Sequence, residues 1–275
     1  MWPDALAVLG LGALGGSVAW RARQAGVGRV IGYSANTADV SQALRSEAIS
    51  DRADSVPRAC RGASMVVVTG SPAAITRALG ELAPHLEPHA IVTDLAPLRL
   101  PVQRSVRESG LADRHAGSCP VVTTHEAGFH GAGTALFRGT TVYVCPSSPD
   151  DSAARGFARF WSDVMEAHPV IMPAESIDRR SAWRVQLPAL VATAIARAES
   201  GRGESADPRA PAARLMEDAA LQAELLLANR AEVLRALQGV GANLAELERL
   251  LVGGDRVGLQ ALLDLPVGPP GHDSK

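Results

Sequence analysis

The feature that most constrains this chain is a glycine-rich stretch near its start, VLGLGALGGSVAW, at residues 8–20. An apolar run at residues 4–12 leads into it, and such a run is typical of a buried strand. Residues 13–26 have helical spacing and close on a glycine, which favours a helix with a glycine cap. A second short strand is predicted at residues 28–34. Together these segments predict a β-α-β unit with a glycine turn at its first corner.

The glycines of this turn have the spacing G-x-G-x-x-G, at Gly10, Gly12 and Gly15. In a β-α-β unit the first glycine permits the turn, the second lets the backbone approach a pyrophosphate, and the third lets helix and strand pack closely. The amides at the helix N-terminus then point at the phosphates. We therefore predict a dinucleotide-binding site that also includes Ala13 and Leu14. A purely structural turn is the alternative.

The second strand of the unit ends at Ser34. The residue type at this position distinguishes proteins that bind NAD from proteins that bind NADP. An acidic side chain there would hold the ribose 2′-hydroxyl of NAD and repel the 2′-phosphate of NADP, whereas a hydroxyl accepts that phosphate. Ser34 is followed by Asn36 and Thr37, with no arginine directly after it. We therefore predict NADP as the cofactor, with NAD possible. Thr69 and Gly70, at the end of the next predicted strand, are added to the cofactor-binding residues.

Apolar strands and helical segments continue to alternate through the first part of the chain. Further strands are predicted at residues 64–71, 89–95 and 140–146, and a helix at about residues 72–86. This alternation predicts an α/β fold with a doubly wound, mostly parallel Rossmann sheet, which we assign to a nucleotide-binding domain over residues 1–172.

The second part of the chain shows helical patterns. Residues 174–199 predict a long helix that Pro188 should kink, and residues 213–265 contain two or three amphipathic helices separated by glycines. We therefore predict an all-helical domain over residues 173–265 and a flexible tail over residues 266–275.

Composition excludes several classes of function. The 275 residues carry a formal net charge of −2, which gives no footprint for nucleic acid or for an anionic membrane. No apolar run reaches the length that spans a membrane. Cys60, Cys119 and Cys145 form no CxxC pattern. We therefore predict no metal site and expect a reducing cytoplasm as the compartment.

Taken together, the motifs resemble the prephenate/arogenate dehydrogenase family over nearly the full length of the chain. The similar segments are GLGALGGSVA, VIGYS, VTDLAP, GSCPVVTTHEAGFHGAGTALFRGTTVYVCP, AWRVQLPAL, LLLANRAEVLRAL and LAELERLLVGGDRVGLQALL. The resemblance implies a helical dimerisation domain after the Rossmann domain, a homodimer, and an active site in the cleft between the two domains.

The resemblance also implies an activity, the oxidative decarboxylation of a cyclohexadienyl carboxylate on the route to tyrosine. Hydride passes from the ring carbon that bears the 4-hydroxyl to the nicotinamide, a base polarises that hydroxyl, and loss of the ring carboxylate makes the product aromatic. Because aromatisation supplies the driving force, the protein needs orientation, one proton acceptor and cationic anchors. The substrate would be prephenate, arogenate or a 4-amino analogue.

Several polar positions of the family pattern are replaced in this chain. The histidine of the family's H-P pair falls on Cys119, and the serine and lysine of its T-D-x-x-S-x-K segment fall on Pro97 and Arg99. The histidine of its S-H-L-P helix falls on Gln186. This many replacements indicate a substrate site that has been rebuilt or abandoned.

Other residues could fill the gap. His125 is predicted as the catalytic base because histidine titrates near neutral pH. Cys119 is a second catalytic candidate, although a thiol is a poor base unless a cation lowers its pKa. Thr124 and Glu126, in the same loop as His125, are predicted to contact substrate. Arg214 is predicted to bind a substrate carboxylate, with a surface ion pair as the alternative.

Three interpretations therefore stay open. The first is an NADP-linked dehydrogenase of this family. The second is a pseudoenzyme that keeps the nucleotide fold and the dimer but serves as a binding or regulatory protein. The third is a reductase of another small acid. Intact glycines beside an altered substrate site fit all three.

Overall fold

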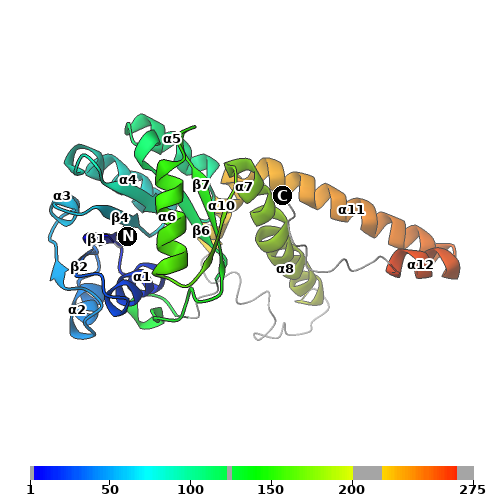
Figure 1. Ribbon diagram of the computed structural model, residues 1–275. Coiled ribbons are helices and arrows are strands. Elements are labelled where there is room, and N and C mark those ends of the chain that lie inside the picture. The colour runs from blue at the N-terminus through cyan, green and yellow to red at the C-terminus, as the bar shows by residue number, and fades with distance from the viewer. Residues whose placement is uncertain (1–2, 123–125, 201–218, 265–275) are drawn as a thin grey trace. The chain divides into compact units, whose positions relative to one another are not determined.

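The computed structural model describes residues 3–122, 126–200 and 219–264 (Figure 1). The chain divides into two compact units. The first contains the chain as far as Ser181 together with helix α10 (Ala219–Ala228), and the second begins at Ala182 and resumes at Asn229. The predicted domain boundary between residues 172 and 173 stays a prediction, and the predicted tail at residues 266–275 lies outside the described residues.

A five-stranded sheet forms the centre of the first unit, and all of its strand pairs are parallel. Its strand order is β3-β2-β1-β4-β5. The strands are β1 (Ala5–Leu9), β2 (Arg29–Tyr33), β3 (Asp51–Arg52), β4 (Met65–Val68) and β5 (Ile91–Asp94). The prediction of an α/β fold with a doubly wound parallel sheet is confirmed.

Helices cover both faces of this sheet because successive strand residues point to opposite faces. Leu6 and Val8 belong to a core formed with α1, α2 and α6, whereas Ala7 and Leu9 belong to a second core formed with α3, α4 and α5. The bounds of these helices are Ala13–Gln24 for α1, Thr37–Arg45 for α2, Val56–Cys60 for α3, Pro72–Leu82 for α4, Leu100–Glu108 for α5 and Ser152–Asp163 for α6.

A second, three-stranded sheet follows, with the order β6-β7-β8. It consists of β6 (Ala116–Pro120), β7 (Thr141–Pro146) and β8 (His168–Ile171). The pair β6–β7 is antiparallel and the pair β7–β8 is parallel. The strand predicted at residues 140–146 is therefore present, but it pairs in this mixed sheet and not in the parallel one.

After β8 the described chain contains only helices and their connections. The first of these helices is α7 (Ala174–Ser181), which is followed by a π-helical turn, η4 (Ala182–Gln186), and by α8 (Leu187–Ser200). Pro188 lies in the first turn of α8. Proline cannot donate the helical hydrogen bond and its ring crowds the preceding turn, so a wider turn directly before it relieves both problems. The kink predicted at Pro188 stays a prediction, and a change of helix type lies directly before this residue.

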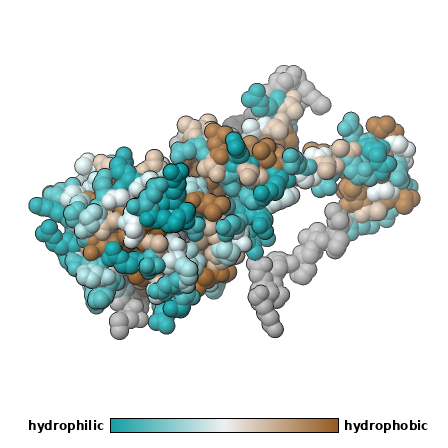
Figure 2. All heavy atoms as spheres, turned by 90° about the horizontal axis from the view of Figure 1, so that it is seen from above, coloured by the Kyte–Doolittle hydropathy of each residue, from teal (hydrophilic) through white to brown (hydrophobic). Residues whose placement is uncertain are grey.

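In the second unit, α11 (Arg230–Val252) and α12 (Arg256–Leu263) follow Asn229. The Asn229 side-chain amide donates a 2.7 Å hydrogen bond to Gln186 Oε1, and both side chains are buried. Several apolar side chains of α11 and α12 are exposed, as the brown patches of Figure 2 also show; they include Leu244, Leu251, Val252, Val257 and Leu263. Within the described ranges, the helices are too short or too polar to cross a membrane.

Candidate active site

The glycine turn joins β1 to α1 and is built by close backbone packing. Gly10 has a φ of 94°, and a Cβ there would come within 2.5 Å of the Thr69 carbonyl oxygen. A Cβ at Gly15 would overlap the carbonyl oxygen of Gly10. Both positions therefore require glycine, the first for its conformation and the second because helix and strand approach so closely.

Gly12 is different, because its surroundings are open. Apart from its two chain neighbours, no described heavy atom lies within 4 Å of the place where its Cβ would be. Gly12 is also the N-cap of α1, and among the described residues no side chain caps it. The helix N-terminus thus offers backbone amides and a positive dipole end to a space that could hold an anion.

A cavity of about 530 Å³ lies against this turn. All of the predicted cofactor-binding residues except Gly15 and Thr37 line it, namely Gly10, Gly12, Ala13, Leu14, Ser34, Asn36, Thr69 and Gly70. Gly15 is packed against the Gly10 carbonyl instead. Thr37 lines a second cavity, of about 1080 Å³, that shares Tyr33, Ser34 and Ala35 with the first.

Thr69 and Asn36 also have structural roles at the cavity wall. The Thr69 hydroxyl donates to the Gly10 carbonyl oxygen at 3.0 Å, which ties the end of β4 to the turn. Asn36 Oδ1 accepts from the Ala38 amide at 3.1 Å and so caps α2. Ser34 Oγ accepts from the Asn36 amide at 3.2 Å, which leaves the serine O–H able to donate to a ligand.

One wall of the first cavity was missed by the sequence analysis. Ala74, Arg77, Ala78 and Glu81 of α4 line it together with Tyr33 of β2. Residues spaced by three and four lie on one face of a helix, and α4 follows the strand next to β1 in the sheet. Those two facts together could have identified this face.

The loop predicted to contact substrate is attached to the nucleotide-binding helices in its described part. The Phe129 amide donates to Asp39 Oδ1 of α2 at 2.9 Å, and the Gly133 amide donates to Ser17 Oγ of α1 at 2.9 Å. The Phe129 ring stacks on Trp20, with centroids 5.9 Å apart. These contacts bring Glu126, predicted as a substrate residue, to the wall of the same cavity as the cofactor residues.

The remaining substrate candidates cannot be placed in this way. Thr124 and His125 lie outside the described residues, and so does Arg214. The predicted roles of these three residues stay predictions.

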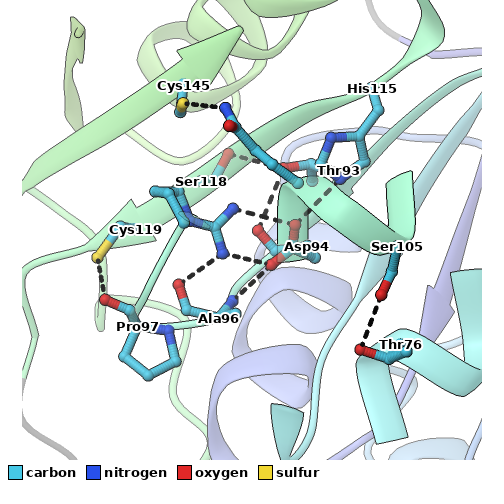
Figure 3. A network of polar contacts seen from close by, with 12 residues as sticks. Thr76, Thr93, Asp94, Ala96, Pro97, Ser105, His115, Ser118, Cys119 and Cys145 are labelled. Carbon is cyan, nitrogen blue, oxygen red and sulfur yellow. Dashed lines mark hydrogen bonds and ion pairs between the residues drawn. The ribbon is translucent and has the colours of Figure 1, made fainter. Parts of the chain in front are cut away.

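A buried cluster of charges lies at the end of β5 (Figure 3). Arg99 and Asp94 form a two-pronged ion pair, with Nη2–Oδ1 at 2.6 Å and Nη1–Oδ2 at 3.0 Å. His115 Nε2 lies 3.0 Å from Asp94 Oδ2, and its Nδ1 lies 2.7 Å from Ser147 Oγ. Asp94, Arg99 and His115 are at most 2% exposed.

The charged groups of this cluster stabilise one another's ionised forms. Burial alone would raise the pKa of Asp94, but the charge of Arg99 and hydrogen bonds from His115 and Arg99 lower it well below its usual range. Arg99 Nη2 also donates to the Ala96 carbonyl oxygen at 2.8 Å. Because both terminal nitrogens of Arg99 are engaged and the side chain is buried, Arg99 is not available to bind a substrate carboxylate in this arrangement.

Cys119 lies on β6 near this cluster, where the sequence places a catalytic candidate. Its Sγ lies 3.8 Å from the Pro97 carbonyl oxygen. Burial raises the pKa of the Cys119 thiol to about 11, and this outweighs the opposite effect of the Arg99 charge. A cation is therefore present, as base chemistry by a thiol would need, but the thiol stays protonated near neutral pH.

Neutral hydrogen bonds tie the surrounding elements together. The Thr93 hydroxyl donates to Ser118 Oγ at 2.8 Å, and Trp161 Nε1 donates to the same oxygen at 2.9 Å. These contacts join β5, β6 and α6. Within the described ranges, no group of three or more His, Cys, Asp or Glu side chains could hold a metal ion.

Comparisons with known proteins place this geometry among related folds. The sequence model of a protein family, the prephenate dehydrogenase nucleotide-binding domain, matches residues 18–169. Arogenate dehydrogenase from Synechocystis is similar over 94% of this chain and 96% of its own, with 22% identity and a TM-score of 0.82.

Prephenate dehydrogenase from Aquifex aeolicus, solved with hydroxyphenyl propionate and NAD+, is similar over 94% of each chain, with 21% identity and a TM-score of 0.83. At these identities the likeness to the two solved structures establishes the fold. A comparison with curated proteins finds no match.

Proposed function

This chain belongs to the prephenate dehydrogenase family, and on that premise we propose that it is an NADP-dependent dehydrogenase that oxidatively decarboxylates a cyclohexadienyl carboxylate. Prephenate, arogenate and a 4-amino analogue are the candidate substrates. The product would be an aromatic acid of the kind that tyrosine synthesis requires.

The observation that carries this proposal is the open space at Gly12. Around it the backbone packs so tightly that Gly10 and Gly15 tolerate no side chain, yet a Cβ at Gly12 would meet no described atom within 4 Å. That space faces the uncapped N-terminus of α1 and the cavity of about 530 Å³. A pyrophosphate fits this combination because helix amides and the helix dipole both favour an anion there.

When bound in this cavity, a nicotinamide nucleotide would supply the hydride acceptor. Ser34 favours NADP over NAD, since a serine hydroxyl can donate to a 2′-phosphate. The substrate side rests on residues outside the described ranges. His125 is proposed to take the proton of the 4-hydroxyl, and the Arg214 guanidinium to bind a carboxylate. Cys119 is the weaker candidate for the base because its thiol is protonated near neutral pH.

A pseudoenzyme that binds nucleotide is the second candidate function. One observation favours it, namely that Arg99 stands where the family pattern has a lysine and is held in a buried ion pair with Asp94. The cation of that position is thus withdrawn from any ligand. A reductase of another small acid would retain nucleotide binding and turnover, and it differs from the main proposal in giving no aromatic product.

A homodimer is also proposed. It is supported by the exposed apolar side chains of α11 and α12, such as Val252 at 84% and Val257 at 79% exposed. Apolar patches of this kind on a helical unit are typical of an association surface. The reducing cytoplasm stays the proposed compartment, in keeping with three free thiols.

The proposed activity is tested by incubating the purified protein with NADP+ or NAD+ and each ring acid while following reduced nicotinamide and the aromatic product. The matched variants are Gly12→Val, which fills the proposed pyrophosphate space, and Gly28→Val, where a Cβ also meets no described atom within 4 Å. We expect turnover in the parent protein and in Gly28→Val, and loss of nucleotide binding in Gly12→Val with an unchanged melting temperature. Nucleotide binding without turnover on any of these acids would refute a cyclohexadienyl substrate and favour the pseudoenzyme or the reductase of another acid, and the absence of nucleotide binding would refute the whole proposal.

A further inference from the structure

The second cavity meets the proposed cofactor cavity at the end of β2. Its volume is about 1080 Å³, and it shares Tyr33, Ser34 and Ala35 with the first cavity. Ser34 is the residue proposed to lie beside the adenosine ribose. The second cavity therefore begins where a substituent on the ribose 2′-carbon would point.

Four arginines line this second cavity, and two of them are already paired. Arg29 Nε lies 3.1 Å from Asp51 Oδ2, and Arg58 Nη1 lies 3.0 Å from Asp54 Oδ2. Glu87, a third carboxylate of the lining, accepts from the Gly62 amide at 2.9 Å. Among the described residues, Arg52 and Arg61 form no ion pair.

Arg52 lies closer to Ser34 than its place in the sequence suggests. It ends β3 and is in register with Gly32 of β2, two residues before Ser34. Adjacent strands lie about 4.8 Å apart and two residues span about 6.6 Å, so the two Cα atoms are separated by roughly 8 Å. Arg52 and Gly32 are in register and therefore share the face of the sheet that α2 covers, and Ser34 directly follows the end of β2 at Tyr33.

Thr37 gives an independent reason to connect this cavity with the cofactor. The sequence motif groups it with Ser34 and Asn36, yet it lines the second cavity and not the first. Thr37 is the first residue of α2, whose N-terminus carries a positive dipole end. Ser34, Thr37 at this helix end and Arg52, which forms no ion pair among the described residues, thus all line one cavity.

We propose that the second cavity takes the 2′-phosphate of NADP, with Arg52 as its counter-charge and Ser34 and Thr37 as hydrogen-bond donors. This inference rests on the proposed function, because it assumes a dinucleotide in the first cavity. The sequence around Ser34 lacks the arginine that would follow it directly, and Arg52 supplies the same group from the neighbouring strand. A planar guanidinium suits a phosphate because it can donate two parallel hydrogen bonds.

The test measures the dissociation constants of NADP+, NAD+, 2′,5′-ADP and 5′-AMP for the full chain by calorimetry. Arg52→Gln is compared with Arg107→Gln, an exposed arginine of α5 on the other face of the sheet. We expect Arg52→Gln to weaken NADP+ and 2′,5′-ADP by about tenfold or more, because a hydrogen bond to a charged group is lost. NAD+ and 5′-AMP should bind as before, and Arg107→Gln should change none of the four constants.

Three outcomes would overturn the inference. They are an unchanged affinity of Arg52→Gln for NADP+, an equal loss for both dinucleotides, and a parent protein that binds NAD+ more tightly than NADP+. A parent protein that binds neither dinucleotide would refute the proposed function itself, whereas in each of the three outcomes above the parent protein still binds NAD+.

Discussion

Replacing Arg99 by methionine tests the buried charge cluster. The variant removes the guanidinium that pairs with Asp94 and leaves a carboxylate that is 0% exposed. His115 and the Ala96 amide remain within hydrogen-bond distance of it. Breaking a buried ion pair by removing one partner costs about 3–5 kcal/mol, because the other charge stays buried and loses most of its compensation.

That loss should be visible as a change in melting temperature and in urea denaturation. For a chain of this size, each kcal/mol lowers the melting temperature by about 2–4 °C, so Arg99→Met should melt roughly 6–20 °C below the parent protein. Arg104→Met is the matched control, because Arg104 is an exposed arginine on α5, the helix whose N-cap is Arg99. We expect little change for this control, since exposed ion pairs contribute little.

The double variant Asp94→Asn/Arg99→Met completes the test. If the cost arises from an uncompensated carboxylate, the double variant should be more stable than the sum of the two single changes predicts. A loss of less than about 1 kcal/mol in Arg99→Met, or strictly additive single variants, would refute the reasoning.

The same ion pair predicts how the stability of the protein depends on pH. The folded protein lowers the pKa of Asp94, so its contribution to stability is complete above the unfolded value of about 3.9 and is lost as the pH falls through the folded value. In Arg99→Met the carboxylate is destabilising while it is ionised. The difference between the two proteins should therefore be largest near neutral pH and shrink in acid, as urea titrations at several pH values would show.

Two further predictions concern the glycine turn and Cys119. Gly15→Ala should lower the melting temperature through an overlap with the Gly10 carbonyl oxygen that costs about 1–3 kcal/mol, and an unchanged melting temperature would contradict the packing described. The Cys119 thiol has its pKa raised to about 11, so alkylation of its peptide by iodoacetamide at pH 8, followed by mass spectrometry, should be roughly 10²-fold slower than for a free thiol and should accelerate toward pH 11. Labelling at the rate of free cysteine at pH 8 would show that the thiol is not perturbed in this way.

The local parts of the fold could be predicted from the sequence because their causes are local. The β-α-β unit follows from apolar periodicity, and the glycine turn from residues only a few positions apart. Most of the predicted cofactor residues line one cavity for the same reason. Thr37 instead lines the second cavity together with Asp51 and Arg52 of β3, and no short motif encodes the pairing of β3 with β2.

The parts that escaped prediction depend on contacts between distant segments. The antiparallel pairing of β6 with β7 brings Gly117 opposite Cys145, and the pattern of a single apolar strand does not reveal its partner. The Arg99 guanidinium is held by Asp94 and occupies the space beside Gly117. A Cβ at Gly117 would overlap this guanidinium. A motif comparison shows only that an arginine replaces a lysine, and not that the arginine is buried.

The attachment of the loop around Phe129 to α1 and α2 has a consequence for the order in which the cavity can form. Its two hydrogen bonds join residues 90 and 116 positions apart, from Asp39 to Phe129 and from Ser17 to Gly133. Contacts of such long sequence separation form late, because a large loop must close first. A nascent chain that ended at β5 would contain the residues of the glycine turn and of the parallel sheet, but it would lack Glu126, Ala127 and Gly128 of the cavity wall. We therefore expect the cavity to be complete only after residues 126–133 have folded onto α1 and α2.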